Sequence, residues 1–302
     1  MHSKTIVNAL TIDVEDYFQV SALAPHISRS DWKSIECRVE RNVDAILSMM
    51  SDCGAKGTFF TLGWVAERYP AMVRRIVAQG HELASHGVEH HRATELAPAA
   101  FLGDLKSSRD LLQQLAGVAV KGYRAPSFSI GKGNLWAFDA IREAGYLYSS
   151  SVYPIKHDHY GMPDAPRFAY QPIPGLTEIP ITTFVALQRN WPAGGGGYFR
   201  LAPYALSRSA IERVHRIDRR PAIFYLHPWE IDPGQPRIPS VGMKTRFRHY
   251  VNLDRTQSRL SRLMGDFRWG RMDDVFAADI RPTITVSQPH KAIAASSAEL
   301  AD

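Results

Sequence analysis

The chain has 302 residues, of which 45% are hydrophobic and 22% are charged, a composition typical of a globular protein with one large α/β core or two smaller ones. The net charge is +6, but the arginines that accumulate between residues 246 and 271 do not alternate with aromatic stacking platforms, so nucleic-acid binding is not expected. Two cysteines, Cys37 and Cys53, are too few for a disulfide framework, and neither a signal peptide nor a membrane-length apolar run is visible, so we expect a cytoplasmic protein.

The first half of the chain alternates between strand and helix patterns. Residues 5–14 form a near-continuous β-rich run of the kind that is buried in a parallel sheet. This alternation predicts parallel strands with helices outside them, as in a barrel or a doubly wound sheet. Further strands are expected over 57–62, 82–85, 121–129 and 146–152, and helices over 38–50, 64–78, 98–115 and 135–143.

The second half of the chain is less regular. The proline-rich stretch 153–180 predicts surface loops. Four consecutive glycines within residues 191–200 could bring the backbone close to a ligand, or they could form a flexible connector. Regular elements are expected to be a short strand over 177–184, a helix over 203–217, an apolar strand over 221–230 that ends on His227, and a long basic amphipathic helix over 245–264.

His86 and His90 stand four residues apart, directly after the expected strand 82–85. At this spacing one turn of helix or a tight loop can direct two imidazoles at one metal ion. Two of the 12 histidines could also fall four apart by chance on a solvated helix. A third ligand has to decide between these interpretations.

Further polar residues stand at the ends of other expected strands. Asp13, Glu15 and Asp16 follow the first strand, Arg124 stands at the fourth, and His227 ends the last. An acid after a strand is often a helix N-cap, and a lone histidine is more often structural than catalytic. The carboxyl ends of parallel strands share one rim, however, and α/β folds place their sites there.

Four ordered motifs carry a resemblance to a known family. The successive motifs of the polysaccharide deacetylase (NodB-homology, carbohydrate esterase) family resemble Thr11–Phe18 (TIDVEDYF), Ser85–His90 (SHGVEH), Tyr123–Ser127 (YRAPS) and Phe224–Trp229 (FYLHPW). The closer likeness, to the exosortase-associated exopolysaccharide deacetylase branch, includes Gly194–Arg200 (GGGGYFR) and His227–Asp232 (HPWEID). The resemblance covers roughly residues 5–275.

This resemblance implies a distorted, incomplete (β/α) barrel and one divalent metal ion, usually zinc, with cobalt or nickel as alternatives. It implies hydrolysis of a linear, non-peptide amide, the N-acetyl group of an amino sugar. Amide hydrolysis needs a metal to polarise the carbonyl, a base for the water proton and an acid for the leaving amine. His86 and His90 match metal ligands. Asp13 matches the family's base, Arg124 the residue that orients it and keeps it ionised, and His227 the acid.

The first motif departs from the common family pattern. Many members carry two adjacent aspartates, base then ligand, whereas here the acids after Asp13 are Glu15 and Asp16. Side chains two apart on a strand share a face, so Glu15 is preferred as the metal ligand and Asp16 is kept in reserve. A second departure is Tyr148–Val152, where relatives often carry an aspartate before the serines, so a supporting carboxylate is missing there.

The resemblance also implies a partner, an N-acetylated oligo- or polysaccharide, either finished polymer or lipid-linked precursor. We expect precursors, with the basic segment 245–264 holding the protein peripherally at the inner membrane surface. Residues 1–280 are expected to form one catalytic domain with a family-specific part over about 170–280, and residues 281–302 a flexible tail. The side chains expected to bind substrate are Tyr17, Phe18, Pro126, Ser127, Tyr198 and Trp229.

Two other functions stay open. Allantoinase-like enzymes share this barrel and an Asp-x-acid first motif, so a hydrolase of a cyclic imide or ureide is the first alternative; the glycine-rich and His-Pro-Trp-Glu segments argue against it. The second alternative is a metal-free, non-catalytic relative that binds glycans. The complete set of base, ligand and acid positions argues against it. Such a relative would stack sugars on an aromatic rim of Tyr17, Phe18, Trp191, Tyr198 and Trp229.

Overall fold

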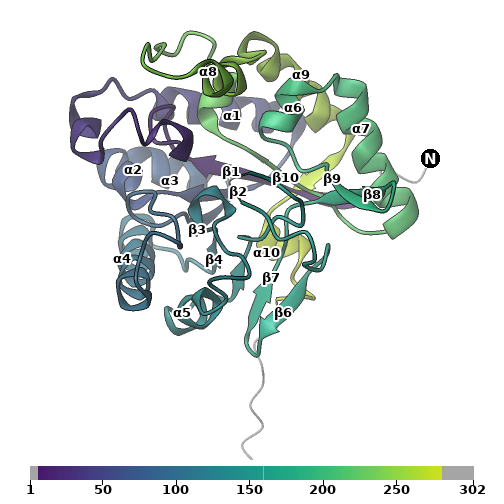
Figure 1. The fold of residues 1–302 in the computed structure, drawn as a ribbon, viewed down its shortest axis with the longest axis horizontal. Coiled ribbons are helices and arrows are strands. Elements are labelled where there is room, and N and C mark those ends of the chain that lie inside the picture. Colours follow the sequence, from purple (N-terminus) through teal and green to yellow (C-terminus); the bar gives the residue numbers. More distant parts are fainter. Residues whose placement is uncertain (1–5, 159, 281–302) are drawn as a thin grey trace, which may run out of the picture.

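The computed structural model describes residues 6–158 and 160–280. Within these residues nine strands form one sheet in the order β10-β1-β2-β3-β4-β5-β7-β6, with β11 paired to β1. All of these pairings are parallel except that of β6 with β7. In the described part of the chain the end strands β10 and β6 are not paired with each other, and helices lie outside the strands (Figure 1). The predicted distorted, incomplete (β/α) barrel is therefore confirmed.

The strands of the barrel are β1 (Val7–Val14), β2 (Thr58–Thr61), β3 (Glu82–Ser85), β4 (Gly122–Tyr123), β5 (Tyr148–Ser149), β6 (Tyr170–Ile173), β7 (Leu176–Glu178), β10 (Ile223–Leu226) and β11 (Arg268–Gly270). A separate antiparallel hairpin consists of β8 (Thr183–Ala186) and β9 (Arg189–Pro192). The strands expected over 121–129 and 146–152 are thus much shorter than predicted, because the chain leaves the sheet as soon as it reaches the rim.

The register of the parallel strands brings their carboxyl ends to one level. Val14 at the end of β1 pairs with Thr61 at the end of β2, and Thr61 pairs with Ser85 at the end of β3. On the other side of β1, Ile12 pairs with Leu226 at the end of β10. Residues that directly follow these strands therefore meet at one rim.

The helices bury one apolar face against the strands. In α1 the residues Val39, Val43, Ile46 and Met50 recur at helical spacing and are fully buried, and Gly54 ends the helix in the left-handed region with a φ of 66°. The helices are α1 (Val39–Cys53), α2 (Gly63–Arg68), α3 (Pro70–Ala78), α4 (Pro98–Ala116), α5 (Ala137–Glu143), α6 (Gly197–Leu201), α7 (Tyr204–Arg213), α8 (Met243–Tyr250), α9 (Leu253–Asp266) and α10 (Met272–Val275).

Two of the predicted helices are wrong in extent. The helix expected over 64–78 is interrupted at Tyr69, whose backbone is not helical, because Pro70 disfavours a helical residue before it and lacks the N–H that would continue α2. The helix expected over 245–264 is interrupted at Asn252, which has a φ of 52°. Apolar periodicity continues across both interruptions, so it does not reveal them.

Other boundaries also differ from the prediction. The strand expected over 177–184 is divided between β7 of the barrel and β8 of the hairpin. The strand expected over 221–230 is only β10, so His227 lies just beyond it, and β11 and α10, which were not predicted, follow later. The predicted tail, residues 281–302, lies outside the described residues. No helix in the described part of the chain is long and apolar enough to cross a membrane.

The run of glycines after β9 packs against β10. A Cβ on Gly195 would lie 2.1 Å from the carbonyl oxygen of Tyr225, and a Cβ on Gly196 would lie 2.3 Å from the Tyr225 hydroxyl oxygen. Gly195 also forms a parallel bridge with Tyr225. Because no side chain fits at either position, the glycines serve close packing of this segment beside β10.

Candidate active site

Two buried carboxylates, those of Asp13 and Glu15, stand at the end of β1 and are 2% and 1% exposed. Asp16 points elsewhere. Its Oδ2 accepts hydrogen bonds from the backbone N–H groups of Arg38 (2.6 Å) and Val39 (2.9 Å) at the start of α1. Asp16 therefore anchors the beginning of a helix, and only Asp13 and Glu15 approach the histidines at the rim.

His86 and His90 lie on the loop after β3 and face Glu15. The three residues can each offer one ligand atom such that all three atoms lie within 4.8 Å of one another, and Glu15 Oε2 is 2.7 Å from His90 Nε2. His86 Nδ1 is 2.8 Å from the carbonyl oxygen of Arg124. Since that oxygen can only accept, Nδ1 carries the proton and Nε2 keeps a free lone pair. His90 has a φ of 55°, so the histidine pair is set by a tight loop rather than by a helix.

Burial and charge determine the protonation of this cluster. Burial raises the pKa of Glu15, but the neighbouring His90 and His227 outweigh it and lower the pKa to about 2. Burial lowers the pKa of His86 to about 4. At neutral pH the cluster thus contains an ionised carboxylate and an unprotonated imidazole, which are the forms that bind a divalent cation.

Arg124 is completely buried and holds Asp13 in place. Its Nη1 donates to Asp13 Oδ1 at 2.6 Å and to Thr11 Oγ1 at 2.8 Å. Its Nη2 and Nε donate to the hydroxyl and carbonyl oxygens of Ser150 at 2.9 and 3.1 Å. A guanidinium with this many fixed partners has little freedom, so it orients the carboxylate of Asp13 and balances its charge.

His227 follows β10 and faces both carboxylates. Its Nε2 lies 3.5 Å from Glu15 Oε1 and 3.9 Å from Asp13 Oδ2, and its Nδ1 lies 2.6 Å from Glu230 Oε1. Burial lowers the pKa of His227, but the carboxylates of Glu15, Glu230 and Asp13 outweigh it and raise the pKa to about 9. The imidazole is therefore protonated at neutral pH, and both of its nitrogens are donors.

Glu230 was not among the predicted site residues. It lies three residues after His227 in the 3-10 turn Pro228–Ile231 and is 1% exposed. Its Oε2 accepts a hydrogen bond from Arg200 Nε at 3.1 Å. Arg200 is itself buried and donates to three carbonyl oxygens around the end of α8. The segment His-Pro-Trp-Glu carried a signal for Glu230, because residues three apart in a 3-10 turn lie on one side.

Trp229 forms a wall of the site. It is 4% exposed and stacks on His227, with 5.3 Å between ring centroids, and on His249, with 4.3 Å. Its Nε1 donates to Glu15 Oε1 at 3.4 Å. The indole therefore fixes the plane of His227 and leaves little surface for a ligand.

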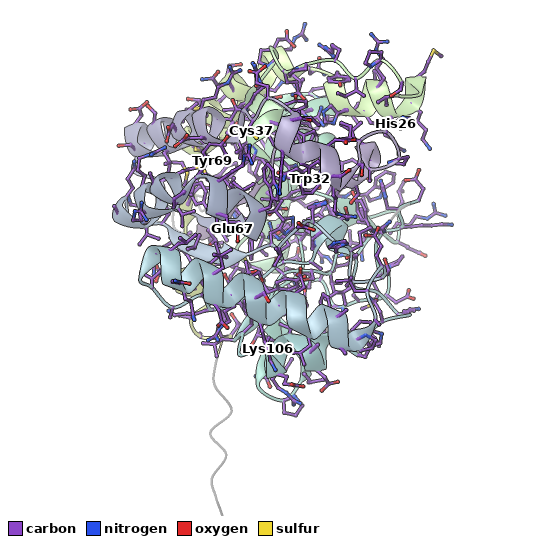
Figure 2. The ribbon with its side chains drawn as sticks, turned by 90° about the vertical axis from the view of Figure 1, so that its left-hand side faces the viewer. His26, Trp32, Cys37, Glu67, Tyr69 and Lys106 are labelled. Atoms are coloured by element: carbon purple, nitrogen blue, oxygen red, sulfur yellow. The ribbon has the colours of Figure 1, made fainter. Side chains whose placement is uncertain are left out.

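Tyr17 and Phe18 lie in the core, so their predicted place on an exposed rim is wrong. They are 2% and 1% exposed, and Phe18 packs edge-on against Trp32 and Trp64. The chain turns inward here because Asp16 caps α1. Figure 2 shows Trp32 on the face of the molecule that also holds Cys37 and Tyr69.

The remaining predicted substrate-binding residues are spread over the rim. Pro126 is buried, and Ser127 is partly exposed with a φ of 56° and its Oγ 2.6 Å from Ser21 Oγ. Tyr198 is also partly exposed and lines a cavity beside the site. The structure thus leaves Ser127 and Tyr198, but not Pro126, with accessible side-chain surface.

A further buried carboxyl, that of Glu178, supports the rim from β7. Its Oε1 accepts hydrogen bonds from the N–H groups of Ser151 and Val152, both at 2.9 Å, while Oε2 has no hydrogen-bond partner among the described residues. Burial raises the pKa of Glu178 from 4.5 to about 7, although those N–H groups act against it. This carboxyl contacts the segment Tyr148–Val152, in which relatives often carry an aspartate and this chain has none.

We expect the stability of the protein to depend on pH through Glu178. Because its folded pKa is raised, its contribution is complete below pH 4.5 and is lost as the pH rises to about 7. The loss should be on the order of 3 kcal/mol. Urea unfolding of wild type and Glu178→Gln at pH 5 and pH 8 measures it, since only wild type contains this carboxyl. A difference between the two proteins that is the same at both pH values would contradict the assignment.

Residues 32–148 match the family described as Polysaccharide deacetylase. Over this stretch the chain is similar to the polysaccharide deacetylase family. The matched stretch contains both histidines of the cluster and Arg124, while Asp13 and Glu15 precede it. Residues 150–277 match a second family, described as Domain of unknown function (DUF3473), and this stretch contains His227.

Curated relatives align with part of the chain. A stretch of 93 residues is 32% identical to a peptidoglycan-N-acetylglucosamine deacetylase of Bacillus cereus, covering 30% of this chain and 34% of the relative. A stretch of 45 residues is 40% identical to a chitooligosaccharide deacetylase of Sinorhizobium fredii, covering 15% and 21%. The chain thus spans well under half of each relative.

A crystal structure of a candidate polysaccharide deacetylase from Mycobacterium smegmatis is similar to this chain in fold. It has a TM-score of 0.59 over 93% of both chains, at 19% sequence identity.

Proposed function

We propose that this protein is a metal-dependent N-deacetylase that removes acetyl groups from amino sugars of an exopolysaccharide or its precursor. The observation that carries the proposal is the meeting, at one rim, of the Glu15, His86 and His90 cluster with Asp13 and His227. Within the proposal, residues 1–280 act as one catalytic domain. The relatives named for deacetylation of peptidoglycan and chitooligosaccharide support the reaction class.

The residues of the cluster fit a divalent metal ion, with zinc as the expected ion. Glu15 Oε2 is buried and makes no well-directed hydrogen bond within the described chain. His86 presents an unprotonated Nε2 because its Nδ1 is held by a carbonyl. Two imidazoles and one carboxylate are a common ligand set of hydrolytic zinc, and they leave room for further ligands. When bound, the metal ion would polarise the acetyl carbonyl and acidify a water molecule.

Asp13 and His227 are suited to opposite proton transfers. Asp13 accepts the proton of the attacking water, and the hydrogen bond from Arg124 Nη1 keeps its carboxylate aimed for that step. His227, protonated at neutral pH, donates a proton to the nitrogen as the carbon–nitrogen bond breaks. The products are acetate and a free amine. Glu230 positions His227 by holding its Nδ1–H.

Replacing Glu230 by glutamine should lower kcat by about tenfold to a hundredfold. Glutamine cannot supply the charge that holds the protonated imidazole in place. KM and metal content should stay near those of wild type, because the ion pairs of Glu230 are with Arg200 and His227 and not with the residues of the cluster. Steady-state kinetics and metal analysis of the same preparation check this.

Asp232→Asn is the matched control for that variant. Asp232 lies two residues later and also pairs with arginines, the partly buried Arg38 and the exposed Arg41, and neither ion pair involves His227. An equal loss of kcat in both variants would show that Glu230 acts only through stability.

Acetate release from N-acetylglucosamine oligomers, with metal content measured on the same sample, tests the proposed function. About one metal ion per chain together with acetate release supports it. Bound metal without acetate release would favour hydrolysis of a cyclic imide or ureide, or an unusual glycan as the substrate. A metal-free, inactive protein would favour the glycan-binding alternative.

We place this activity on precursors at the inner membrane surface. The helix α8 supports this location, because it exposes Met243 and Phe247 one turn apart, beside Lys244 and Arg248. Absence of the protein from sedimented membranes at low salt would argue against it.

A further inference from the structure

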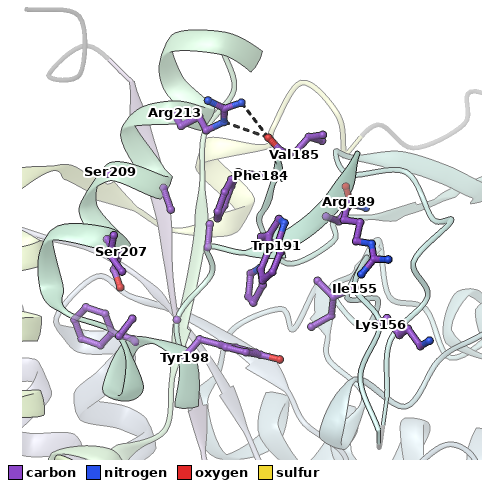
Figure 3. A pocket seen from close by; sticks show the side chains of 18 of the residues that line it. Ile155, Lys156, Phe184, Val185, Arg189, Trp191, Tyr198, Ser207, Ser209 and Arg213 are labelled. Atoms are coloured by element: carbon purple, nitrogen blue, oxygen red, sulfur yellow. Dashed lines mark hydrogen bonds between the residues drawn. The ribbon is translucent and has the colours of Figure 1, made fainter. Parts of the chain in front are cut away.

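A large cavity lies outside the cluster of Glu15, His86 and His90, none of which lines it. Its volume is about 1350 Å³, which exceeds that of most small-molecule sites. The walls are the β8–β9 hairpin, helices α6 and α7, and the loop that carries Ile155 and Lys156. Figure 3 shows Trp191 in the middle of this cavity, with Tyr198 below it and Ser207 and Ser209 of α7 opposite.

Apolar side chains are exposed around this cavity to an unusual degree. Val185, Trp191, Leu201 and Leu206 all line it, and between 40% and 61% of each residue is exposed. Leu187, at the tip of the same hairpin, is 88% exposed. A soluble protein rarely gathers so many exposed aliphatic and aromatic residues in one place unless they meet an apolar ligand or surface.

Two cations stand at one side of the cavity. Lys156 and Arg189 both line it, and no ion pair of either with a carboxylate is found among the described residues; the carboxylate of Asp164, which also lines the cavity, pairs with Lys132 instead. Figure 3 shows their side chains on the same side of the opening. Arg213, on α7 at the opposite side, donates hydrogen bonds to the carbonyl oxygen of Val185 and so links the hairpin to α7. Lys156 and Arg189 are therefore available for an anionic group.

The cavity adjoins the candidate active site. Tyr198 lines the cavity and stands on α6, directly after the glycine run that packs against Tyr225. The Tyr225 ring in turn contacts the His227 ring edge-on, with 5.8 Å between centroids. One layer of side chains therefore separates the cavity from the residue that faces the carboxylates. A ligand in the cavity can belong to the same molecule as a sugar at the rim.

We propose that this cavity binds the apolar chain of a phosphate-linked lipid carrier. Lys156 and Arg189 bind the phosphate, and the glycan extends to the cluster of Glu15, His86 and His90. The inference rests on the proposed function and narrows its substrate class to a lipid-linked glycan. The aliphatic side chains of Leu201 and Leu206 offer no hydrogen-bonding group, so a hydrocarbon chain fits the wall that they form better than a sugar does.

The test uses farnesyl phosphate as a soluble probe, measured by calorimetric titration of the intact protein. Wild type should bind it more tightly than farnesol or inorganic phosphate, each of which lacks one half of the probe. Arg189→Glu and Leu206→Glu should each weaken binding by about tenfold or more, through repulsion of the phosphate and through a charge in the apolar wall. Arg74→Glu and Ile217→Glu change exposed residues outside the cavity and should bind like wild type.

Several results would overturn the proposal. These are no binding of farnesyl phosphate, equal weakening by the control variants, and displacement of the probe by phosphatidylglycerol vesicles, which would make the cavity a site for bulk membrane lipid. Weaker binding of N-acetylglucosamine oligomers in Arg189→Glu and Leu206→Glu, with unchanged binding of the probe, would make it a glycan subsite. Acetate release from water-soluble oligomers tests the deacetylase separately, so its failure is distinguishable from failure of the lipid site.

Discussion

Replacing Asp13 by asparagine is expected to reduce acetate release by about a hundredfold to ten-thousandfold while metal stays bound. The amide has nearly the same shape as the carboxylate and can still accept from Arg124 Nη1, which lies 2.6 Å from Asp13 Oδ1. It cannot take a proton from water. The loss should appear in kcat, with the metal content per chain measured on the same preparation.

Asp16→Asn is the matched control for Asp13→Asn. The two aspartates lie three residues apart in one segment and are both buried, but Asp16 serves the start of α1. Its loss should lower stability by about 1 kcal/mol and spare kcat and metal binding. If Asp13→Asn instead lost the metal, Asp13 would be a ligand, and if Asp16→Asn lost it, the reserve assignment would be the right one.

Much of the rim could be predicted from the sequence because local patterns determine it. Asp13, His86 and His227 each stand at or next to the end of an expected strand, and a parallel sheet brings such positions together without further information. The preference for Glu15 over Asp16 followed from strand alternation, and the position of Asp16 at the start of α1 agrees with it.

Other parts of the site depend on contacts that no local pattern contains. Arg200 stands thirty residues before Glu230, and the two meet only because the glycine run lets α6 pack beside β10. Tyr17 and Phe18 were misplaced because adjacency to a strand end does not tell which way the following loop turns. The hydrogen bonds of Asp16 to α1 decide that direction, and they are tertiary.

Replacing His86 by alanine is expected to abolish metal binding and, with it, acetate release. One of the three proposed protein ligands is removed, and the remaining pair, Glu15 and His90, cannot enclose a cation. The readout besides activity is thermal unfolding with and without a chelator. Metal bound only by the folded state stabilises it by about 2.7 kcal/mol at a free concentration one hundred times Kd. Chelation should therefore lower the Tm of wild type and leave that of the variant unchanged.

His91→Ala separates this effect from the loss of any histidine in the same loop. His91 neighbours His90 but lies near Glu89 and Glu95, and its side chain is 30% exposed. It contributes no atom to the cluster, so its variant should keep both the metal and the response to chelator. Equal responses to the chelator in His86→Ala and His91→Ala would mean that the substitutions disturb the structure of the loop rather than remove a metal ligand. Metal retained in His86→Ala would contradict the proposal that this cluster binds the metal. It would favour the alternative of a glycan-binding protein that catalyses no reaction at this rim.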